Sequence, residues 1–143
     1  MIDSFLGPYA FLGNDYPVNV DLDDHTYPSV EHAYQASKTR DPHKRTRIRS
    51  AATVDLARQM GAALSLTGDK RNLEVMRRLL LDKFTSYQDL EDKLLATGTT
   101  DLINGTWDSR DTFWGVHRGV GENMLGKLLM EIRHDLRFDN ATE

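Results

Sequence analysis

The amino-acid sequence predicts a mainly α fold, a single compact multihelical domain with a small β hairpin near its N-terminus. Apolar residues recur at helical spacing over most of the chain, whereas one short stretch near the start alternates as a strand does. The 143 residues suit one domain of ordinary size, and no internal repeat, low-complexity tract or linker divides them. We therefore expect residues 1–143 to form one domain.

The hairpin is expected over residues 18–27. Residues 18–22, Val-Asn-Val-Asp-Leu, alternate between apolar and polar side chains, which is typical of a half-buried strand. Asp23 and Asp24 favour a turn, and His25 begins the second short strand.

The first three helices are delimited by residues that favour helix ends. Ser29 is a suitable N-cap for a helix that runs through Lys38. Asp41 caps the next helix, with a proline at its first position. A third helix is predicted over residues 53–60, and Gly61 closes it.

Two helices and a loop follow before the last helix. A helix from about Lys70 carries apolar residues at helical spacing. Ser86 with Asp89 resembles a capping box for the next helix, which Gly98 ends. Residues 101–120 are rich in Gly, Asn and Asp and contain both tryptophans, so we expect an ordered loop.

An amphipathic helix over residues 122–136 closes the predicted fold. Its aliphatic side chains share one face and should point inward: Leu125, Leu128, Leu129, Ile132 and Leu136.

Composition excludes several classes of protein. Hydrophobic residues make up 39% and charged residues 28% of the chain, and no stretch approaches the roughly 18 uncharged apolar residues of a membrane span. The N-terminal residues lack the basic start and apolar run of a signal peptide, and the absence of cysteine excludes disulfides and thiolate metal sites. The formal charge of −4 argues against a protein that coats nucleic acid through phosphate contacts. We expect a cytoplasmic protein without membrane contact.

Positive charge is nevertheless concentrated between residues 38 and 49. This basic segment contains one acid, Asp41, and these cations: Lys38, Arg40, Lys44, Arg45, Arg47 and Arg49. Such a segment suits a phosphate or a pyrophosphate, and it equally suits a solvated helix face or an acidic protein partner.

The helix that begins after Ser29 carries the first candidate site. Glu31, Gln35 and Lys38 lie at i, i+4 and i+7 and therefore share a stripe, on which the first and last are about 10 Å apart along the axis. A carboxylate transfers protons, and a lysine in a dry pocket becomes a neutral nucleophile. An ordinary surface helix with polar residues fits the same pattern.

Residues 108–126 form the second candidate region. Their glycines precede a helix N-terminus, which favours an anion, and Trp114 offers a flat face for a base. Asp111 is suited to accept a hydrogen bond from a ribose hydroxyl. A core tryptophan and glycines that merely shape a turn explain the pattern as well. The five histidines show no metal-ligand spacing and no serine-nucleophile elbow occurs, so we expect neither a metal nor a cofactor.

The two regions, with shorter motifs between them, resemble the NADAR family, also called YbiA-like. The matching motifs are residues 11–14 (Phe-Leu-Gly-Asn), 27–32 (Tyr-Pro-Ser-Val-Glu-His), 35–38 (Gln-Ala-Ser-Lys), 75–77 (Val-Met-Arg), 83–84 (Lys-Phe), 95–98 (Leu-Ala-Thr-Gly), 111–115 (Asp-Thr-Phe-Trp-Gly) and 121–133 (Gly-Glu-Asn-Met-Leu-Gly-Lys-Leu-Leu-Met-Glu-Ile-Arg). Order and approximate spacing agree from residue 11 to about residue 136. The chain departs from the family at residues 68–70, Gly-Asp-Lys, near which many members carry a tryptophan.

The resemblance implies an N-glycosidase that cleaves the bond between a ribose and a nitrogenous base. The implied substrates are small nucleotides: ADP-ribosylated guanine, also within nucleic acid, or ribosylamino-pyrimidine phosphates of riboflavin synthesis. Glu31 and Lys38 would be the catalytic pair, and Asp111 would line the same pocket as a third catalytic residue. Substrate contacts are implied for the remaining motif residues: His32, Gln35, Trp114, Gly115, Gly121 and Asn123.

Two mechanisms and two other functions remain open on the sequence. Lys38 either attacks the anomeric carbon and holds the sugar as a Schiff base, or only binds substrate while Glu31 activates water. The chain is otherwise a catalytically silent module that binds ADP-ribose or NAD, or a protein-interaction domain that uses the basic segment.

Overall fold

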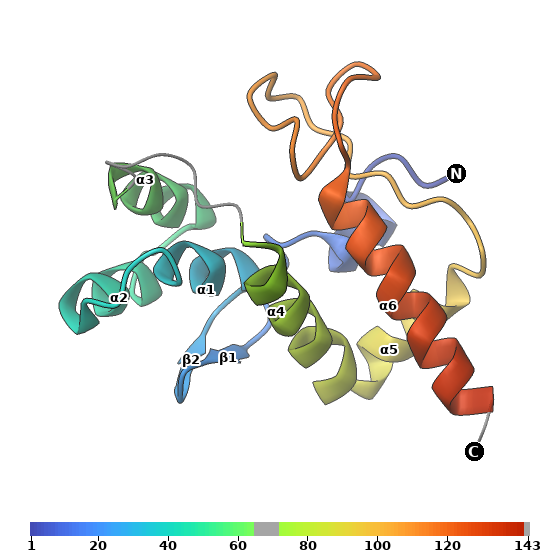
Figure 1. The fold of residues 1–143 in the computed structure, drawn as a ribbon, viewed down its shortest axis with the longest axis horizontal. Helices are drawn as coiled ribbons and strands as arrows, with labels where there is room; N and C mark the ends of the chain where they lie inside the picture. The colour runs from blue at the N-terminus through green and yellow to red at the C-terminus, as the bar shows by residue number, and fades with distance from the viewer. Residues whose placement is uncertain (65–71, 142–143) are drawn as a thin grey trace. The chain divides into compact units, whose positions relative to one another are not determined.

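The computed structural model describes residues 1–64 and 72–141, and for residues 140 and 141 only the backbone. The described residues are mostly helical and include a two-stranded antiparallel sheet (Figure 1). The predicted mainly α fold with an N-terminal hairpin is therefore confirmed. Contacts between residues divide the chain into two compact units. The middle unit is Asn14–Ser86, and the terminal unit combines Met1–Gly13 with Tyr87–Glu143.

The hairpin opens the middle unit. Strand β1 (Val20–Leu22) pairs with β2 (His25–Tyr27), and Val20 lies opposite Tyr27. The strand begins later than the alternation from residue 18 indicates. Asp23 and Asp24 have φ angles of 48° and 69°, the left-handed conformation that a two-residue hairpin turn requires and that aspartate tolerates.

Four helices complete the middle unit: α1 (Val30–Ala36), α2 (Pro42–Arg49), α3 (Val54–Leu64) and α4 (Leu73–Ser86). Helix α1 contacts the other three helices and both strands, and it lies between α3 and α4 in Figure 1. All seven of its residues are buried. The alternative of a solvent-facing polar helix is therefore wrong, because its polar side chains are enclosed by neighbouring elements.

Two predicted helix ends in this unit are wrong. Helix α1 ends at Ala36 and not at Lys38, because Ser37 acts as its C-cap. Helix α3 passes through Gly61 to Leu64, so this glycine does not close it. A Cβ atom at Gly61 would lie 1.8 Å from the Oε1 atom of Gln35, so the glycine permits close approach between α3 and α1. The expected start of the next helix at Lys70 and the departure at residues 68–70 lie outside the described residues.

The terminal unit contains the short 3-10 helix η1 (Gly7–Leu12) and the helices α5 (Gln88–Ala96) and α6 (Met124–Ala141). Helix α6 begins two residues after its expected start. Its predicted inward face is confirmed, since every member of it is buried: Leu125, Leu128, Leu129, Ile132 and Leu136. Arg133, also buried, donates from α6 to the Thr97 hydroxyl at 2.9 Å and to the Thr100 carbonyl at 2.8 Å.

The predicted capping box before α5 is wrong. Ser86 ends α4 and donates to the Asp82 carboxylate at 2.9 Å, and Tyr87 occupies the N-cap of α5 without a side-chain cap. Gly98 does follow the end of α5, with a φ angle of 67°.

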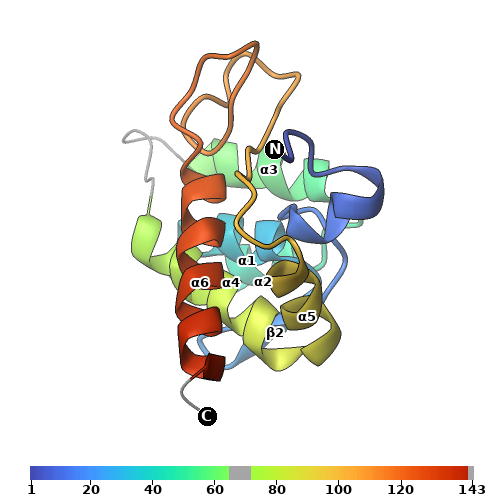
Figure 2. The same ribbon diagram turned by 90° about the vertical axis from the view of Figure 1, so that its right-hand side faces the viewer.

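A long irregular loop connects α5 and α6 in the terminal unit (Figure 2). It is ordered by isolated backbone bridges, in which Ile2 pairs with Leu102 and Gly105 pairs with Val116. The expected ordered loop is thus present. None of the described helices has the length and apolar character that a membrane crossing requires.

Candidate functional site

The start of α1 positions the first candidate side chain. Ser29 has the extended backbone of an N-cap and accepts a hydrogen bond from the His32 N–H at 3.0 Å. Glu31 occupies the first turn, and its N–H donates to the Asn14 carbonyl at 3.1 Å. The Glu31 side chain is therefore held at a fixed place in the middle unit.

The Glu31 carboxylate is bound asymmetrically. Its Oε1 atom accepts from Gln35 Nε2 at 2.8 Å and from Arg58 Nε at 3.2 Å. Within residues 1–64 and 72–141, no donor reaches Oε2. Glu31 is only 8% exposed, and Oε2 is not among the buried atoms that lack a partner, so the small exposed part of the side chain includes this oxygen. Such an oxygen is suited to take a proton from a bound water or substrate.

Arg58 connects Glu31 to two further carboxylates. It forms a short ion pair with Asp15 and another with Asp55 at 3.1 Å. Partial burial lowers the pKa of Arg58, but the carboxylates of Glu31, Asp15 and Asp55 outweigh it and raise that pKa above its usual value. Arg58 is therefore a permanent cation beside Glu31. We call Asp15, Glu31, Gln35 and Arg58 the Glu31 cluster.

Gln35 presents a buried acceptor next to this carboxylate. Its amide nitrogen must face Glu31, because the reverse orientation would place two oxygens together. Its Oε1 atom is buried, and no described residue donates to it. The Oδ1 atom of Asn14 is also buried and accepts no hydrogen bond from any described residue. Unsatisfied buried acceptors are costly, so both atoms are suited to a donor that a ligand or water supplies.

His32 has a visible structural role. It is 4% exposed, and its ring nitrogens lie 2.7 Å from the Ser29 hydroxyl and 3.0 Å from the Ala51 carbonyl. These contacts tie α1 to the segment before α3. The substrate contact expected of His32 stays a prediction.

Lys38 does not share a continuous helical stripe with Glu31. It follows the end of α1, is half-buried, and its ammonium lies 5.8 Å from the centre of the Tyr34 ring. The expected row of three side chains is therefore reduced to Glu31 and Gln35, which do contact each other.

Lys83 is a candidate that sequence reasoning missed. It is fully buried on α4, with its ammonium 5.4 Å from the Tyr16 ring centre and 5.0 Å from that of Phe84. Burial lowers its pKa to about 7, although the charge of Asp15 acts in the opposite direction. The signal was present in the sequence, because Lys83 falls on the buried face that Met76 and Leu80 define.

The residues of the second candidate region lie in the terminal unit. Asn123 precedes α6 with a φ angle of 53°; its side chain accepts from the Asn104 N–H at 2.8 Å and donates to the Leu102 carbonyl at 3.0 Å. Gly121 packs closely on the loop, since a Cβ atom there would lie 2.2 Å from the Gly115 carbonyl oxygen. These residues therefore shape the loop that precedes α6.

Asp111 and Trp114 belong to the same loop. The Asp111 N–H donates to the Asp108 carbonyl at 3.0 Å, and the Trp114 ring packs edge-on against Phe113 with ring centres 4.8 Å apart. Both side chains are half-buried. Because Asp111 and Trp114 lie in a different unit from Glu31, their assignment to the same reaction stays a prediction. In the parts of the chain that the structure describes, no group of three or more His, Asp or Glu side chains is placed to hold a metal ion.

Comparison with known proteins identifies the family. The family model described as NADAR domain matches residues 4–137. The chain belongs to the NADAR family. This confirms the resemblance that the motifs indicate, and the match includes both units of this NADAR protein.

Several relatives of this NADAR protein carry functional names. N-glycosidase YbiA of Escherichia coli (strain K12) is 35% identical over 136 residues, which cover 92% of this chain and 84% of that protein. N-glycosidase Npun_R5314 of Nostoc punctiforme is 33% identical over 138 residues, which cover 91% of this chain and 87% of that protein. The chloroplastic riboflavin biosynthesis protein PYRR of Zea mays is 33% identical, over 90% of this chain and 23% of that protein. The NMR structure of E. coli YbiA matches with a TM-score of 0.83 at 31% identity, and covers 99% of this chain and 88% of that one.

Proposed function

We propose that this NADAR protein is an N-glycosidase that hydrolyses the bond between a ribose and a nitrogenous base. The names of its relatives support this reaction class. The observation that carries the proposal is the Glu31 carboxylate, in which Gln35 and Arg58 fix one oxygen and the other faces no donor among the described residues.

The chemistry requires one proton acceptor beside the anomeric carbon. In the water mechanism, Glu31 Oε2 accepts a proton from water as the water oxygen bonds to that carbon. The bond to the base nitrogen breaks, the electron pair leaves with the base, and the nitrogen takes up the proton from Glu31. Arg58 holds Oε1 of the same carboxylate at 3.2 Å, which leaves Oε2 for this proton transfer.

A lysine mechanism inserts a covalent step. A neutral amine bonds to the anomeric carbon, the base departs with the bonding electrons and a proton, and the opened sugar is held as a Schiff base that water hydrolyses. Lys38 is the amine that the family resemblance implies, and it is half-buried. Lys83 has the more suitable protonation state, because burial lowers its pKa to about 7. Trapping with borohydride, followed by peptide mapping, identifies which lysine, if either, forms the adduct.

Two substrate classes fit the proposal: ADP-ribosylated guanine, free or within nucleic acid, and the phosphorylated ribosylamino-pyrimidines of riboflavin synthesis. The relatives named as riboflavin biosynthesis proteins support the second class. The remaining predicted site residues, among them Asp111 and Trp114, belong to the proposal as substrate contacts or proton carriers. The alternative function is a catalytically silent module that binds ADP-ribose or NAD.

The test is a cleavage assay by mass spectrometry on ADP-ribosylated guanosine and on a phosphorylated ribosylamino-pyrimidine. We expect the wild type to release free base from at least one substrate and Glu31→Gln to be slower by about 100-fold or more, because general acid–base groups contribute factors of this size. Glu91→Gln is the matched control, since Glu91 occupies the first turn of α5 as Glu31 does in α1. No release from either substrate, with ADP-ribose binding intact, would support the silent module instead.

A further inference from the structure

A second polar site lies in the middle unit, away from the Glu31 cluster. It is a pocket of about 510 Å³, and its polar lining residues are Asp23, Ser37, Arg40, Arg45, Asn72 and Arg78. No member of the Glu31 cluster lines it. We propose that this pocket binds the phosphate or diphosphate group of a small molecule through Arg40 and Arg78. The inference concerns binding and does not depend on the proposed glycosidase activity.

One arginine of the pocket is already engaged. Arg45 donates to the Asp23 carboxylate at 2.7 Å and to the Thr39 carbonyl at 2.6 Å, and its side chain is only 18% exposed. The hydrogen bond from Arg45 lowers the pKa of Asp23, and the charges of Arg78 and Arg40 lower it further. Asp23 therefore stays ionised and neutralises one of the three arginines.

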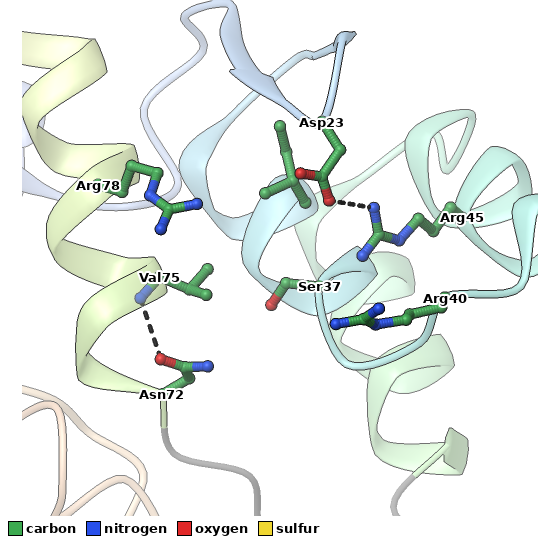
Figure 3. Close-up of a pocket in the computed structure, with 8 residues that line it drawn as sticks. Asp23, Ser37, Arg40, Arg45, Asn72, Val75 and Arg78 are labelled. Carbon is green, nitrogen blue, oxygen red and sulfur yellow. Dashed lines mark hydrogen bonds and ion pairs between the residues drawn. The ribbon is translucent and has the colours of Figure 1, made fainter.

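The other two arginines leave an excess positive charge on the pocket. In Figure 3, Arg40 and Arg78 extend toward the pocket from different elements, the segment before α2 and helix α4. Among the residues that the structure describes, Arg78 pairs only with the exposed Glu74, at 3.5 Å, and exposed pairs of this kind contribute little. Arg40 forms no ion pair with any residue that the structure describes. The described lining therefore has three arginines against one carboxylate, Asp23, which Arg45 already binds.

The N-terminus of α4 adds to the attraction for an anion. Asn72 Oδ1 caps this 14-residue helix by accepting from the Val75 N–H at 3.0 Å, and both residues line the pocket. The partial positive charge of a helix N-terminus favours anions. The Asn72 amide nitrogen, to which no described acceptor is bound, provides an additional donor.

The geometry and size indicate the class of ligand. Guanidinium groups form paired hydrogen bonds with phosphate oxygens, and a group with two or more negative charges matches the two unneutralised arginines. A volume of about 510 Å³ falls within the range of roughly 300–1,000 Å³ of small-molecule sites. The phosphate belongs either to the substrate or to a separate nucleotide.

The binding test uses inorganic pyrophosphate and titration calorimetry at low salt. We expect the wild type to bind, Arg40→Gln/Arg78→Gln to bind at least about 10-fold more weakly, and Arg47→Gln to bind as the wild type does. Arg47 is the matched control, because it is an exposed arginine of α2 outside the pocket. Thermal unfolding without ligand checks that both variants are folded before their binding is compared. Equal binding by the wild type and the double variant, or no binding by the wild type, overturns the proposal.

Two kinetic arms distinguish the source of the phosphate. If the substrate supplies it, the double variant raises KM for a phosphorylated substrate and leaves KM for its dephosphorylated form unchanged. If a separate nucleotide supplies it, pyrophosphate changes the wild-type rate without competing with substrate. Absence of any cleavage would contradict the proposed function and leave the binding test intact, so the two failures are distinguishable.

Discussion

The burial of Lys83 makes the stability of the protein depend on pH. Its pKa is about 7 in the folded protein against 10.5 in an exposed lysine, so between these values the unfolded chain binds more protons. The free energy of unfolding therefore rises with pH from about 7 toward 10 and is unaffected by this group below 7. Each pKa unit of difference corresponds to about 1.4 kcal/mol.

We expect the wild-type melting temperature to rise between pH 7 and pH 9.5, and Lys83→Met to lack this rise and to be the more stable protein at pH 7. Thermal unfolding followed at several pH values checks this. Lys127→Met, at an exposed position of α6, is the control and should keep the wild-type profile. Parallel profiles for wild type and Lys83→Met would contradict the argument.

Gly61 is a second residue with a specific steric role. Alanine normally stabilises a helix interior relative to glycine by up to about 1 kcal/mol. At Gly61 a methyl group would instead displace Gln35, whose Oε1 atom lies 1.8 Å from the added Cβ position. We expect Gly61→Ala to lower the free energy of unfolding by about 1–3 kcal/mol, the usual cost of overpacking, and to weaken the contact between Gln35 and Glu31.

The matched control for Gly61→Ala is the double variant with Gln35→Ala. Removal of the Gln35 amide removes the closest contacts and leaves the Gln35 Cβ atom 3.0 Å from the new methyl group, so urea unfolding should show part of the stability recovered. No recovery would mean that the backbone of α3, and not the Gln35 side chain, resists the substitution.

At the scale of elements, we expect the N-cap of α1 to contribute more to the free energy of unfolding than an exposed cap does. Ser29 is 2% exposed, and loss of its hydroxyl would leave the buried His32 N–H and the Nδ1 atom of the His32 ring without their partner. We expect Ser29→Ala to cost about 2 kcal/mol. Asp41→Ala, at the exposed cap of α2, should cost about 1 kcal/mol, because water replaces the lost acceptor. Chemical denaturation of both variants measures the difference, and equal costs would contradict it.

Helix ends were predictable from the sequence where hydrogen bonds between residues close in the chain determine them. Ser29 and Asp41 cap their helices as expected, because a cap bond joins residues two or three positions apart. Gly61 was assigned wrongly, because a helix-ending glycine and a glycine that admits a neighbouring side chain look alike in sequence. The neighbour, Gln35, is far away in the chain.

The same distinction applies to the candidate site. The contact between Glu31 and Gln35 follows from helical spacing and is present. Arg58 and Asp15 were not predicted as partners, since each comes from a separate segment and no local pattern joins them to Glu31. The break between Glu31 and Lys38 arises at the C-cap Ser37, a residue type that also occurs within helices.

At the scale of the whole molecule, the predicted site residues are divided between the two units. Glu31, Gln35 and Lys38 belong to the middle unit, whereas Asp111 and Asn123 belong to the terminal unit. The family match over residues 4–137 includes both units, so both groups of predicted site residues lie within the NADAR domain. Whether the groups serve one reaction is a question that kinetics can answer.

A double-mutant cycle between Glu31→Gln and Asp111→Asn provides the last prediction. If both carboxylates act in the same reaction, each single substitution lowers kcat/KM strongly, and the double variant loses much less than the product of the single losses, because groups that act as a unit are non-additive. Glu91→Gln combined with Glu31→Gln should give losses that multiply, as expected for independent positions. If the Asp111 and Glu31 losses also multiply, Asp111 contributes independently of Glu31. If Asp111→Asn retains full kcat/KM, Asp111 only shapes its own loop, and it drops out of the catalytic assignment.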